Sequence, residues 1–390
     1  MDTRGGIEMS IMRIVLTLVI MLSVMGGANF YVARRIYGWL SLLLPQINAK
    51  IYIGAYILLV LITILGFARS FLPVPVTIKN ILGWISSYSI GIFAFLIMLF
   101  FVTDLVLFLG GIVKVIPQPM PSSIRFCAGL LVLVLTAGIV GYGAYNATQV
   151  RHVSYDIEIG FTEEMKVVMI ADLHLGTTNN ESNLAKIVQG VNSVEPDIVC
   201  IVGDIFNDDY FAIRNPDAAA ALLKSINATY GVYAVLGNHD AGRTLNEMMA
   251  FLERSNINLL NDEYVIIDER LILLGRLDPS PIGGFGDMQR NDTADILAAI
   301  DTSLPVVVME HNPSVIDQYG RETDLILSGH THSGQIFPGS LITRAMFTVS
   351  YGHYQEDSDS PHVIVTSGVG TWGTPLRVGT NNEIVSIGLR

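Results

Sequence analysis

The second half of the chain carries short motifs of acidic, amide and imidazole side chains, each following an apolar run. They are Asp172-Leu173-His174, Gly203-Asp204, Gly237-Asn238-His239-Asp240, Glu310-His311 and Gly329-His330-Thr331-His332. Five of the eight histidines of the chain lie in these motifs. Oxygen and imidazole groups without thiolates suit Mn, Fe, Zn or Mg rather than a structural zinc site. The motifs therefore indicate a divalent-metal centre.

The apolar runs before the motifs have the length and the β-branched composition of buried strands. Strands are expected at 153–159, 166–170, 197–202, 232–236, 271–274, 305–309, 324–327 and 362–365. Helices are expected between several of them, at 183–194, 217–226, 245–253, 292–300 and 313–318. This alternation predicts an α/β domain. Ligands bind at the carboxyl ends of the strands in such sheets, so the motifs are expected to converge at one edge.

The number of candidate ligands distinguishes one metal ion from two. The set is Asp172, His174, Asp204, Asn238, His311, His330 and His332. A single tetrahedral ion needs about four ligands. Seven side chains with one bridging carboxylate supply two ions with four protein ligands each and leave positions for water and substrate. Each motif alone has an ordinary explanation, such as helix capping by Asn238, but the full series predicts two divalent ions.

The first half of the chain has a different composition from the second. Residues 1–150 hold 9 Lys and Arg against 3 Asp and Glu, whereas residues 151–390 hold 14 against 32. Four runs without charged side chains meet or approach the ~20 residues that span a bilayer. They cover residues 14–33, 51–68, 80–103 and 126–150. We therefore expect a four-helix transmembrane domain over 1–150 and an α/β domain over 151–390, whose net charge of −18 argues against a nucleic-acid partner.

Four crossings place both ends of the chain on the same side of an integral membrane protein. The basic residues are divided almost evenly between the two sides of the membrane. The charges of Arg34, Arg35 and Lys50 decide the orientation and place the first loop inside and the α/β domain on the extracytoplasmic side. Asp104 stands near the end of the third run. It is either a functional carboxylate within the membrane or part of a contact at the interface or between helices.

In order, the motifs read D-x-H, G-D, G-N-H-D, H and G-H-x-H, a series that resembles the calcineurin-like metallophosphoesterase superfamily over about residues 160–390. The ending from Ser367 to Gly373, with Pro375-Leu376-Arg377, is similar to a bacterial, membrane-attached branch of that superfamily. The resemblance implies two facing mixed β-sheets flanked by helices. It also implies that Asp172, His174 and His332 hold one metal, that Asn238, His311 and His330 hold the other, and that Asp204 bridges them. His239 would then contact the phosphoryl group or protonate the leaving group.

Two details of the resemblance stay open in the sequence. Many relatives have a second Asp three residues after the bridging one, but here that residue is Asn207, followed by Asp208. Either Asp208, Asp240 or neither orients His239. Arg377 either reaches a phosphate oxygen or is a packing or surface arginine.

The expected activity is hydrolysis of a phosphodiester or pyrophosphate by metal-bound hydroxide. Paired divalent ions lower the pKa of a shared water from ~15.7 toward ~7, and His239 supplies a proton to the departing oxygen. The α/β domain begins within a few residues of the last membrane run in a protein expected in a bacterial cell membrane. We therefore expect the bilayer as a partner and a phospholipid or lipid-linked pyrophosphate as substrate. The alternative is a membrane receptor that holds a phosphorylated ligand without turnover. A third possibility, a transport or sensing unit formed by the four helices, is supported only by Asp104.

Overall fold

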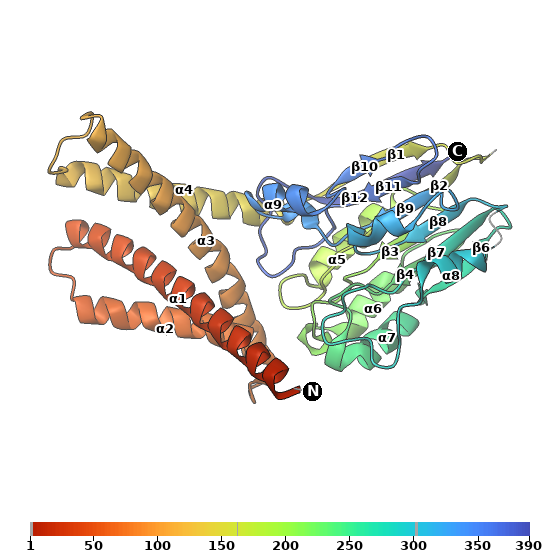
Figure 1. Ribbon diagram of the computed structural model, residues 1–390, viewed down its shortest axis with the longest axis horizontal. Helices are drawn as coiled ribbons and strands as arrows, with labels where there is room; N and C mark the ends of the chain where they lie inside the picture. The colour runs from red at the N-terminus through yellow and green to blue at the C-terminus, as the bar shows by residue number, and fades with distance from the viewer. Residues whose placement is uncertain (1–2, 162, 301–302) are drawn as a thin grey trace. The chain divides into compact units, whose positions relative to one another are not determined.

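The computed structural model describes residues 3–161, 163–300 and 303–390 (Figure 1). The chain divides into two compact units. The first, called here the helical unit, comprises Met1–Phe67 and Ile85–Val140. The second, called here the α/β unit, comprises Gly141–Arg390 together with Ala68–Trp84, a segment from the first half of the chain.

Four long helices account for the apolar first half of the chain. They are α1 (Thr3–Leu43), α2 (Ala49–Phe67), α3 (Val76–Ile112) and α4 (Ser122–Asn146). Each is long and apolar enough to cross a membrane, which agrees with the four runs in the sequence. A short 3-10 turn, η1 (Arg69–Phe71), follows α2.

Helices α1 and α3 continue past the charged residues at which the apolar runs stop. The reason is a polar contact between them. The Nε of Arg35 donates to Asp104 Oδ2 at 2.7 Å, and the hydroxyl of Tyr31 donates to the same oxygen at 2.6 Å. A carboxylate paired in this way costs less free energy near the bilayer than an isolated one. Asp104 is therefore part of a helix–helix contact.

Helix α4 ends at Asn146, four residues before the end of the apolar run. The Asn146 side chain donates to the carbonyls of Arg377 and Thr380, at 3.2 and 2.8 Å, and these bonds fix the last turn. Strand β1 then begins at Val150, which pairs with Asn382. The last turn of α4 thus packs within the α/β unit, and only three residues separate it from the first strand.

Two six-stranded mixed sheets form the α/β unit, as the sequence analysis expected. The first sheet contains β1 (Val150–Ile157), β12 (Asn382–Leu389), β2 (Met165–Ile170), β3 (Ile198–Val202), β4 (Val232–Val235) and β5 (Asn258–Leu259), in that order. The second contains β10 (Gly352–Tyr354), β11 (His362–Val365), β9 (Leu325–Ser328), β8 (Val306–Met309), β7 (Leu271–Gly275) and β6 (Glu263–Ile267). Strands β2, β3 and β4 are parallel to one another, as are β7, β8 and β9.

An apolar core lies between the two sheets, and helices cover their outer faces (Figure 1). Met169 of β2 and Met309 of β8 belong to the same buried cluster between the sheets. Helices α5 (Glu181–Asn192), α6 (Pro216–Lys224) and α7 (Leu245–Arg254) pack on the first sheet. Helix α8 (Thr293–Ala298) and the 3-10 segment η4 (Pro313–Gln318) pack on the second, and α9 (Gly339–Met346) follows a 3-10 turn, η5 (His332–Gly334). The strands place every polar motif at a carboxyl end.

Candidate metal centre

The seven candidate ligands lie just beyond the ends of β2, β3, β4, β8 and β9, and they come from both sheets. Six of them are buried, and His330 is partly buried. Five have positive φ angles between 45° and 68°, a conformation that costs a side chain other than glycine about 1–3 kcal/mol. These five are Asp172, His174, Asp204, His330 and His332. Such strain at one sheet edge is typical of a functional site.

The first group of side chains consists of Asp172, His174 and His332. One potential ligand atom from each lies within 4.8 Å of the others. The Nε2 atoms of His174 and His332 are 3.0 Å apart, and His332 Nε2 is 3.4 Å from Asp172 Oδ1. Three donor atoms at these distances are suitably placed to coordinate a single cation.

The second group consists of Asp204, His311 and His330, again with potential ligand atoms within 4.8 Å of one another. The Oδ1 of Asn238 lies 2.8 Å from His330 Nδ1, which brings the amide to the same place. Asp204 Oδ2 lies 3.3 Å from His311 Nε2 and 3.6 Å from His174 Nε2. One carboxylate oxygen therefore faces both groups.

The hydrogen bonds of His311 show that its donor set suits a cation. Its Nδ1 donates to the carbonyl of Val202 at 2.8 Å, so Nε2 is the ring nitrogen that faces Asp204, whose negative charge raises the pKa of His311 well above its usual value despite burial. Within the described part of the chain, Nε2 is buried and has no hydrogen-bond partner. It faces the acceptor oxygen of Asp204 across 3.3 Å. Two electron-pair donors this close are stabilised when a positive charge lies between them.

Glycine beside the motifs allows this crowding. A Cβ on Gly203 would lie 2.5 Å from His311 Nδ1, and a Cβ on Gly329 would lie 2.7 Å from Asp172 Oδ2. Real Cβ atoms do not approach other atoms so closely. Any side chain at either position would push a candidate ligand out of place.

Burial and neighbouring charges together determine the charge of the candidate ligands. It lowers the pKa of His174 to about 3 and that of His330 to about 4, so both imidazoles are neutral at pH 7. Neutral imidazole is the form that binds metal. Burial also raises the pKa of Asp172 to about 7. Burial alone would raise the pKa of Asp204, but the neighbouring histidines hold it well below its usual range. Asp204 is therefore an anion.

Comparison with known proteins supports the same chemistry. The calcineurin-like phosphoesterase family model matches residues 165–334. An uncharacterized metallophosphoesterase of Campylobacter jejuni is 32% identical over 274 residues, which cover 68% of this chain and 71% of the relative. The chain belongs to the calcineurin-like metallophosphoesterase family. Another metallophosphoesterase, from Aquifex aeolicus, is 31% identical over 58% of this chain and 85% of its own length.

A further relative includes part of the membrane half. It is a transmembrane protein with metallophosphoesterase domain from Danio rerio, 29% identical over 333 residues, which cover 79% of this chain and 74% of the relative. Together with the four apolar helices, this similarity makes the chain a membrane protein. The chain is thus a membrane metallophosphoesterase, a member of a family of enzymes that hydrolyse phosphate esters with divalent metals.

Asp208, not Asp240, contacts His239 in this metallophosphoesterase. The Nδ1 of His239 lies 2.6 Å from Asp208 Oδ1. Asp240 instead accepts backbone N–H bonds from Ile205, Phe206 and Gly237. Burial alone would lower the pKa of His239, but the hydrogen bond to Asp208 and the nearby carboxylates raise it. His239 therefore carries a proton at neutral pH more often than an ordinary histidine does.

Arg377 has a packing role. It is fully buried and donates to the carbonyls of His332, Ser367 and Gly370, at 2.9, 2.6 and 2.7 Å. One of its terminal nitrogens also lies 3.3 Å from His332 Nδ1. Because the donors of the guanidinium are used by the backbone, the geometry favours packing over a phosphate contact. Arg377 orients His332.

Replacing Arg377 with Met is expected to weaken metal binding about 10- to 100-fold, because supporting contacts to a metal-binding histidine have effects of that size. It also leaves the buried carbonyls of Ser367 and Gly370 without a donor, each costing about 1–3 kcal/mol of folding free energy. Metal titration and thermal unfolding measure the two effects. Arg321→Met is the matched control, because Arg321 pairs with Asp359 at the exposed surface. Unchanged metal affinity in Arg377→Met would contradict the orienting role.

Some contacts in the α/β unit could not be predicted from the sequence. Residues 68–84 read as a loop and the start of a membrane helix, yet they pack within the α/β unit. The guanidinium of Arg243 lies 4.9 Å from the ring centroid of Phe71, and Thr177 Oγ1 donates to Asn80 Oδ1 at 3.3 Å. Trp372 lies 5.7 Å from His239, ring to ring. These contacts join residues far apart in the chain, so no local pattern marks them.

The three remaining histidines belong to strands. His353 of β10 and His362 of β11 contact each other at 2.9 Å between Nε2 and Nδ1. His152 lies on β1. None of the three belongs to the two groups of candidate ligands found in the described residues.

Proposed function

We propose that this metallophosphoesterase uses a dinuclear metal centre to hydrolyse a phosphodiester or pyrophosphate of a membrane lipid. The proposed ligands are Asp172, His174 and His332 for one ion and Asn238, His311 and His330 for the other, with Asp204 between them. Bound divalent ions would activate water and neutralise the phosphoryl oxygens. The two groups of donor atoms and the position of Asp204 support this assignment.

His239 is the proposed proton donor to the leaving oxygen. Its ring centroid lies 5.2 Å from that of His174, so it borders the first group of candidate ligands. Asp208 contacts Nδ1 and raises the pKa of the imidazole, which leaves the opposite edge of the ring for the substrate. A positioned acid of raised pKa favours departure of an alkoxide or phosphate.

The observation that carries the lipid proposal is the attachment of α4 next to the candidate centre. The carbonyl of Gly143 accepts from the N–H of Arg377 at 3.0 Å. Arg377 in turn holds His332. The end of a membrane-spanning helix therefore contacts the residue that positions a candidate metal ligand. Tyr142 and Tyr145 on this last stretch of α4 are exposed, as is common for tyrosines at a membrane–water interface.

Helix α9 supports a substrate at the bilayer surface. Its exposed apolar residues are Leu341, Ile342 and Met346, which are 55%, 59% and 70% exposed. The helix follows η5, and the ring of Phe347 just after it lies 6.1 Å from that of His330. The N–H of Phe337 donates to the carbonyl of Val378, in the segment that holds α4. An apolar helix face in this position is suited to lie in the lipid interface.

The substrate class is tested by comparing initial rates on detergent-dispersed phospholipids, lipid-linked pyrophosphates and soluble nucleotides, with Mn, Zn or Fe supplied. We expect a lipid to have the highest kcat/KM. A clear preference for soluble nucleotides would remove the lipid proposal and leave the enzyme class intact.

Replacing Leu341, Ile342 and Met346 together with Gln is expected to lower hydrolysis of phospholipid in vesicles by about tenfold or more. Burial of each such side chain contributes roughly 1.5–3 kcal/mol, so even partial insertion into the interface contributes a large part of the free energy of membrane binding. Hydrolysis of a soluble aryl phosphodiester by the same variant should not change. The control is Ile266→Gln on β6, which removes an exposed apolar side chain elsewhere on the unit. Equal losses on both substrates would point to a defect in the metal centre and contradict the interfacial role of α9.

For the side of the membrane, we propose that the α/β unit is extracytoplasmic, because Arg34, Arg35 and Lys50 belong to the opposite face by the positive-inside rule. External protease added to sealed cells should then cleave the α/β unit. Protection in intact cells with cleavage after lysis would reverse the assignment.

A further inference from the structure

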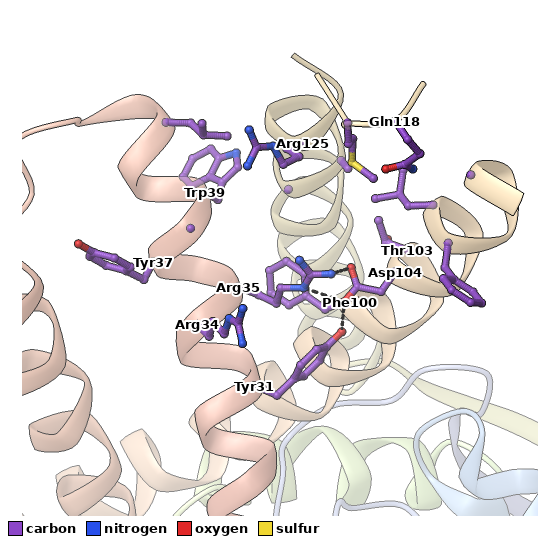
Figure 2. Close-up of a pocket in the computed structure, with 18 of the residues that line it drawn as sticks. Tyr31, Arg34, Arg35, Tyr37, Trp39, Phe100, Thr103, Asp104, Gln118 and Arg125 are labelled. Carbon is purple, nitrogen blue, oxygen red and sulfur yellow. Dashed lines mark hydrogen bonds and ion pairs between the residues drawn. The ribbon is translucent and has the colours of Figure 1, made fainter. Parts of the chain in front are cut away.

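A large cavity lies within the helical unit, between α1, α3 and α4 (Figure 2). Its volume is about 1060 Å³, enough for the head group of a phospholipid and part of its acyl chains. Three arginines and one aspartate line it: Arg34, Arg35, Arg125 and Asp104. None of its lining residues is a candidate ligand of the metal centre.

The single carboxylate of the cavity already has partners within the protein. Asp104 forms an ion pair with Arg35 and accepts the hydroxyl of Tyr31 (Figure 2). Arg125 donates only to a neutral partner, the hydroxyl of Ser122, at 3.2 Å. Among the residues that the structure describes, neither Arg34 nor Arg125 forms an ion pair. Two uncompensated positive charges therefore line one cavity.

These charges lie toward the end of the helical unit at which α1 ends and α4 begins. Arg34 is nine residues before the end of α1 at Leu43, which is ~13 Å along the helix. Arg125 is in the first turn of α4. In a four-span chain α1 ends, and α4 begins, on the same membrane face. Trp39, whose ring stacks on Phe126 with centroids 5.8 Å apart, adds the aromatic lining common at that level.

We propose that this cavity binds the head group of an anionic phospholipid, with Arg34 and Arg125 as the positive charges that attract it. The planar guanidinium matches phosphate oxygens with paired hydrogen bonds, and two such groups also offset the additional negative charge of an anionic head group. The rest of the lining includes Phe100, Leu107 and Phe108, which suit acyl chains. Basic pockets between membrane helices are known to bind anionic lipids.

The apolar lining favours a lipid over a free anion. A small soluble phosphate would leave these apolar side chains without contacts, whereas a lipid covers them and supplies the same phosphate. The Arg35–Asp104 pair joins α1 to α3 at the wall of the cavity, so the carboxylate does not neutralise Arg34 or Arg125. The site is thus a lipid-binding site separate from the reaction.

The test measures lipid retention by the purified full chain in detergent, by native mass spectrometry with a chelator present to prevent hydrolysis. The probes are phosphatidylglycerol and phosphatidylcholine. We expect selective retention of phosphatidylglycerol by the wild-type chain. The double variant Arg34→Gln, Arg125→Gln should retain about tenfold less, since a hydrogen bond to a charged group contributes enough to change binding by that factor. Equal retention of the two lipids by the wild-type chain would overturn the proposal.

Lys50→Gln is the matched control, because it removes one positive charge near the same membrane face and does not line the cavity. It should retain phosphatidylglycerol as the wild-type chain does. If the double variant does not fold, the single variants Arg34→Gln and Arg125→Gln replace it, each with an expected loss of about threefold. Wild-type retention by these arginine variants would overturn the proposal, as would displacement of the lipid by inorganic phosphate at equal concentration.

This measurement is independent of the proposed function. Lipid retention is read without turnover, and the arginine variants are expected to keep wild-type hydrolysis of a soluble aryl phosphodiester. If the arginine variants lose lipid selectivity but keep full hydrolysis, the result bears on the cavity alone. If the wild-type chain retains lipid selectively but does not hydrolyse lipids, the result bears on the substrate of the metal centre.

Discussion

Replacing Asp204 with Ala is expected to abolish phosphoesterase activity and metal binding together, with a rate loss on the order of 10⁴-fold or more. The physical reason is the position of Asp204 Oδ2, which lies 3.3 Å from His311 Nε2 and 3.6 Å from His174 Nε2. Removing this carboxylate leaves the buried imidazoles of His311 and His174 without the negative charge that lies next to both. Metal content of the purified chain and the initial rate on an aryl phosphodiester measure the two losses.

His332→Ala should behave in the same way, because His332 Nε2 lies 3.0 Å from His174 Nε2. Asp357→Ala is the control, since Asp357 is an exposed carboxylate that caps a surface turn. Far-ultraviolet circular dichroism against the metal-free wild-type chain separates loss of metal from loss of fold. Full activity in either variant at the candidate centre would refute the assignment of the ligands.

Replacing His239 with Ala is expected to lower kcat by about 10²- to 10⁴-fold while the metal stays bound, because a positioned general acid contributes rate enhancements of that size. His239 contacts Asp208 and not the candidate metal ligands through its Nδ1. Metal analysis and steady-state kinetics on the same preparation measure both properties. Lost metal with an unchanged rate per bound metal would contradict the role of His239 as acid.

Asp208→Asn distinguishes a positioned acid from a structural histidine. Asp208 contributes to the raised pKa of His239, so its removal should lower that pKa. An acid works while it is protonated, and its activity falls as pH rises through its pKa. The alkaline limb of the kcat profile should therefore move to lower pH in Asp208→Asn, with metal content unchanged. If kcat falls by the same factor at every pH and the alkaline limb does not move, Asp208 has a merely structural role.

The residue types and their order determined most of the fold and the composition of the candidate site. Hydrophobic runs of about 20 residues indicate membrane spans from local composition alone. Short β-branched runs indicate strands, and residues such as Asp204 and His311 directly follow them. Because the carboxyl ends of neighbouring parallel strands meet at one edge, the convergence of the motifs within each sheet follows from chain order and strand direction, and the packing of the two sheets brings their edges together.

The tertiary structure decided which partner each polar side chain has. Asp240 is adjacent to His239 in the chain and Asp208 is 31 positions away, yet the three-dimensional course of the loop after β3 brings Asp208 within 2.6 Å of the imidazole. The sequence allows Arg377 either to contact a phosphate or to pack, and the structure places its guanidinium among buried carbonyls. The pairing of Arg35 with Asp104 spans 69 positions of the chain. Secondary structure depends on local periodicity, whereas ion pairs, hydrogen bonds and cavities depend on distances between segments that sequence spacing does not encode.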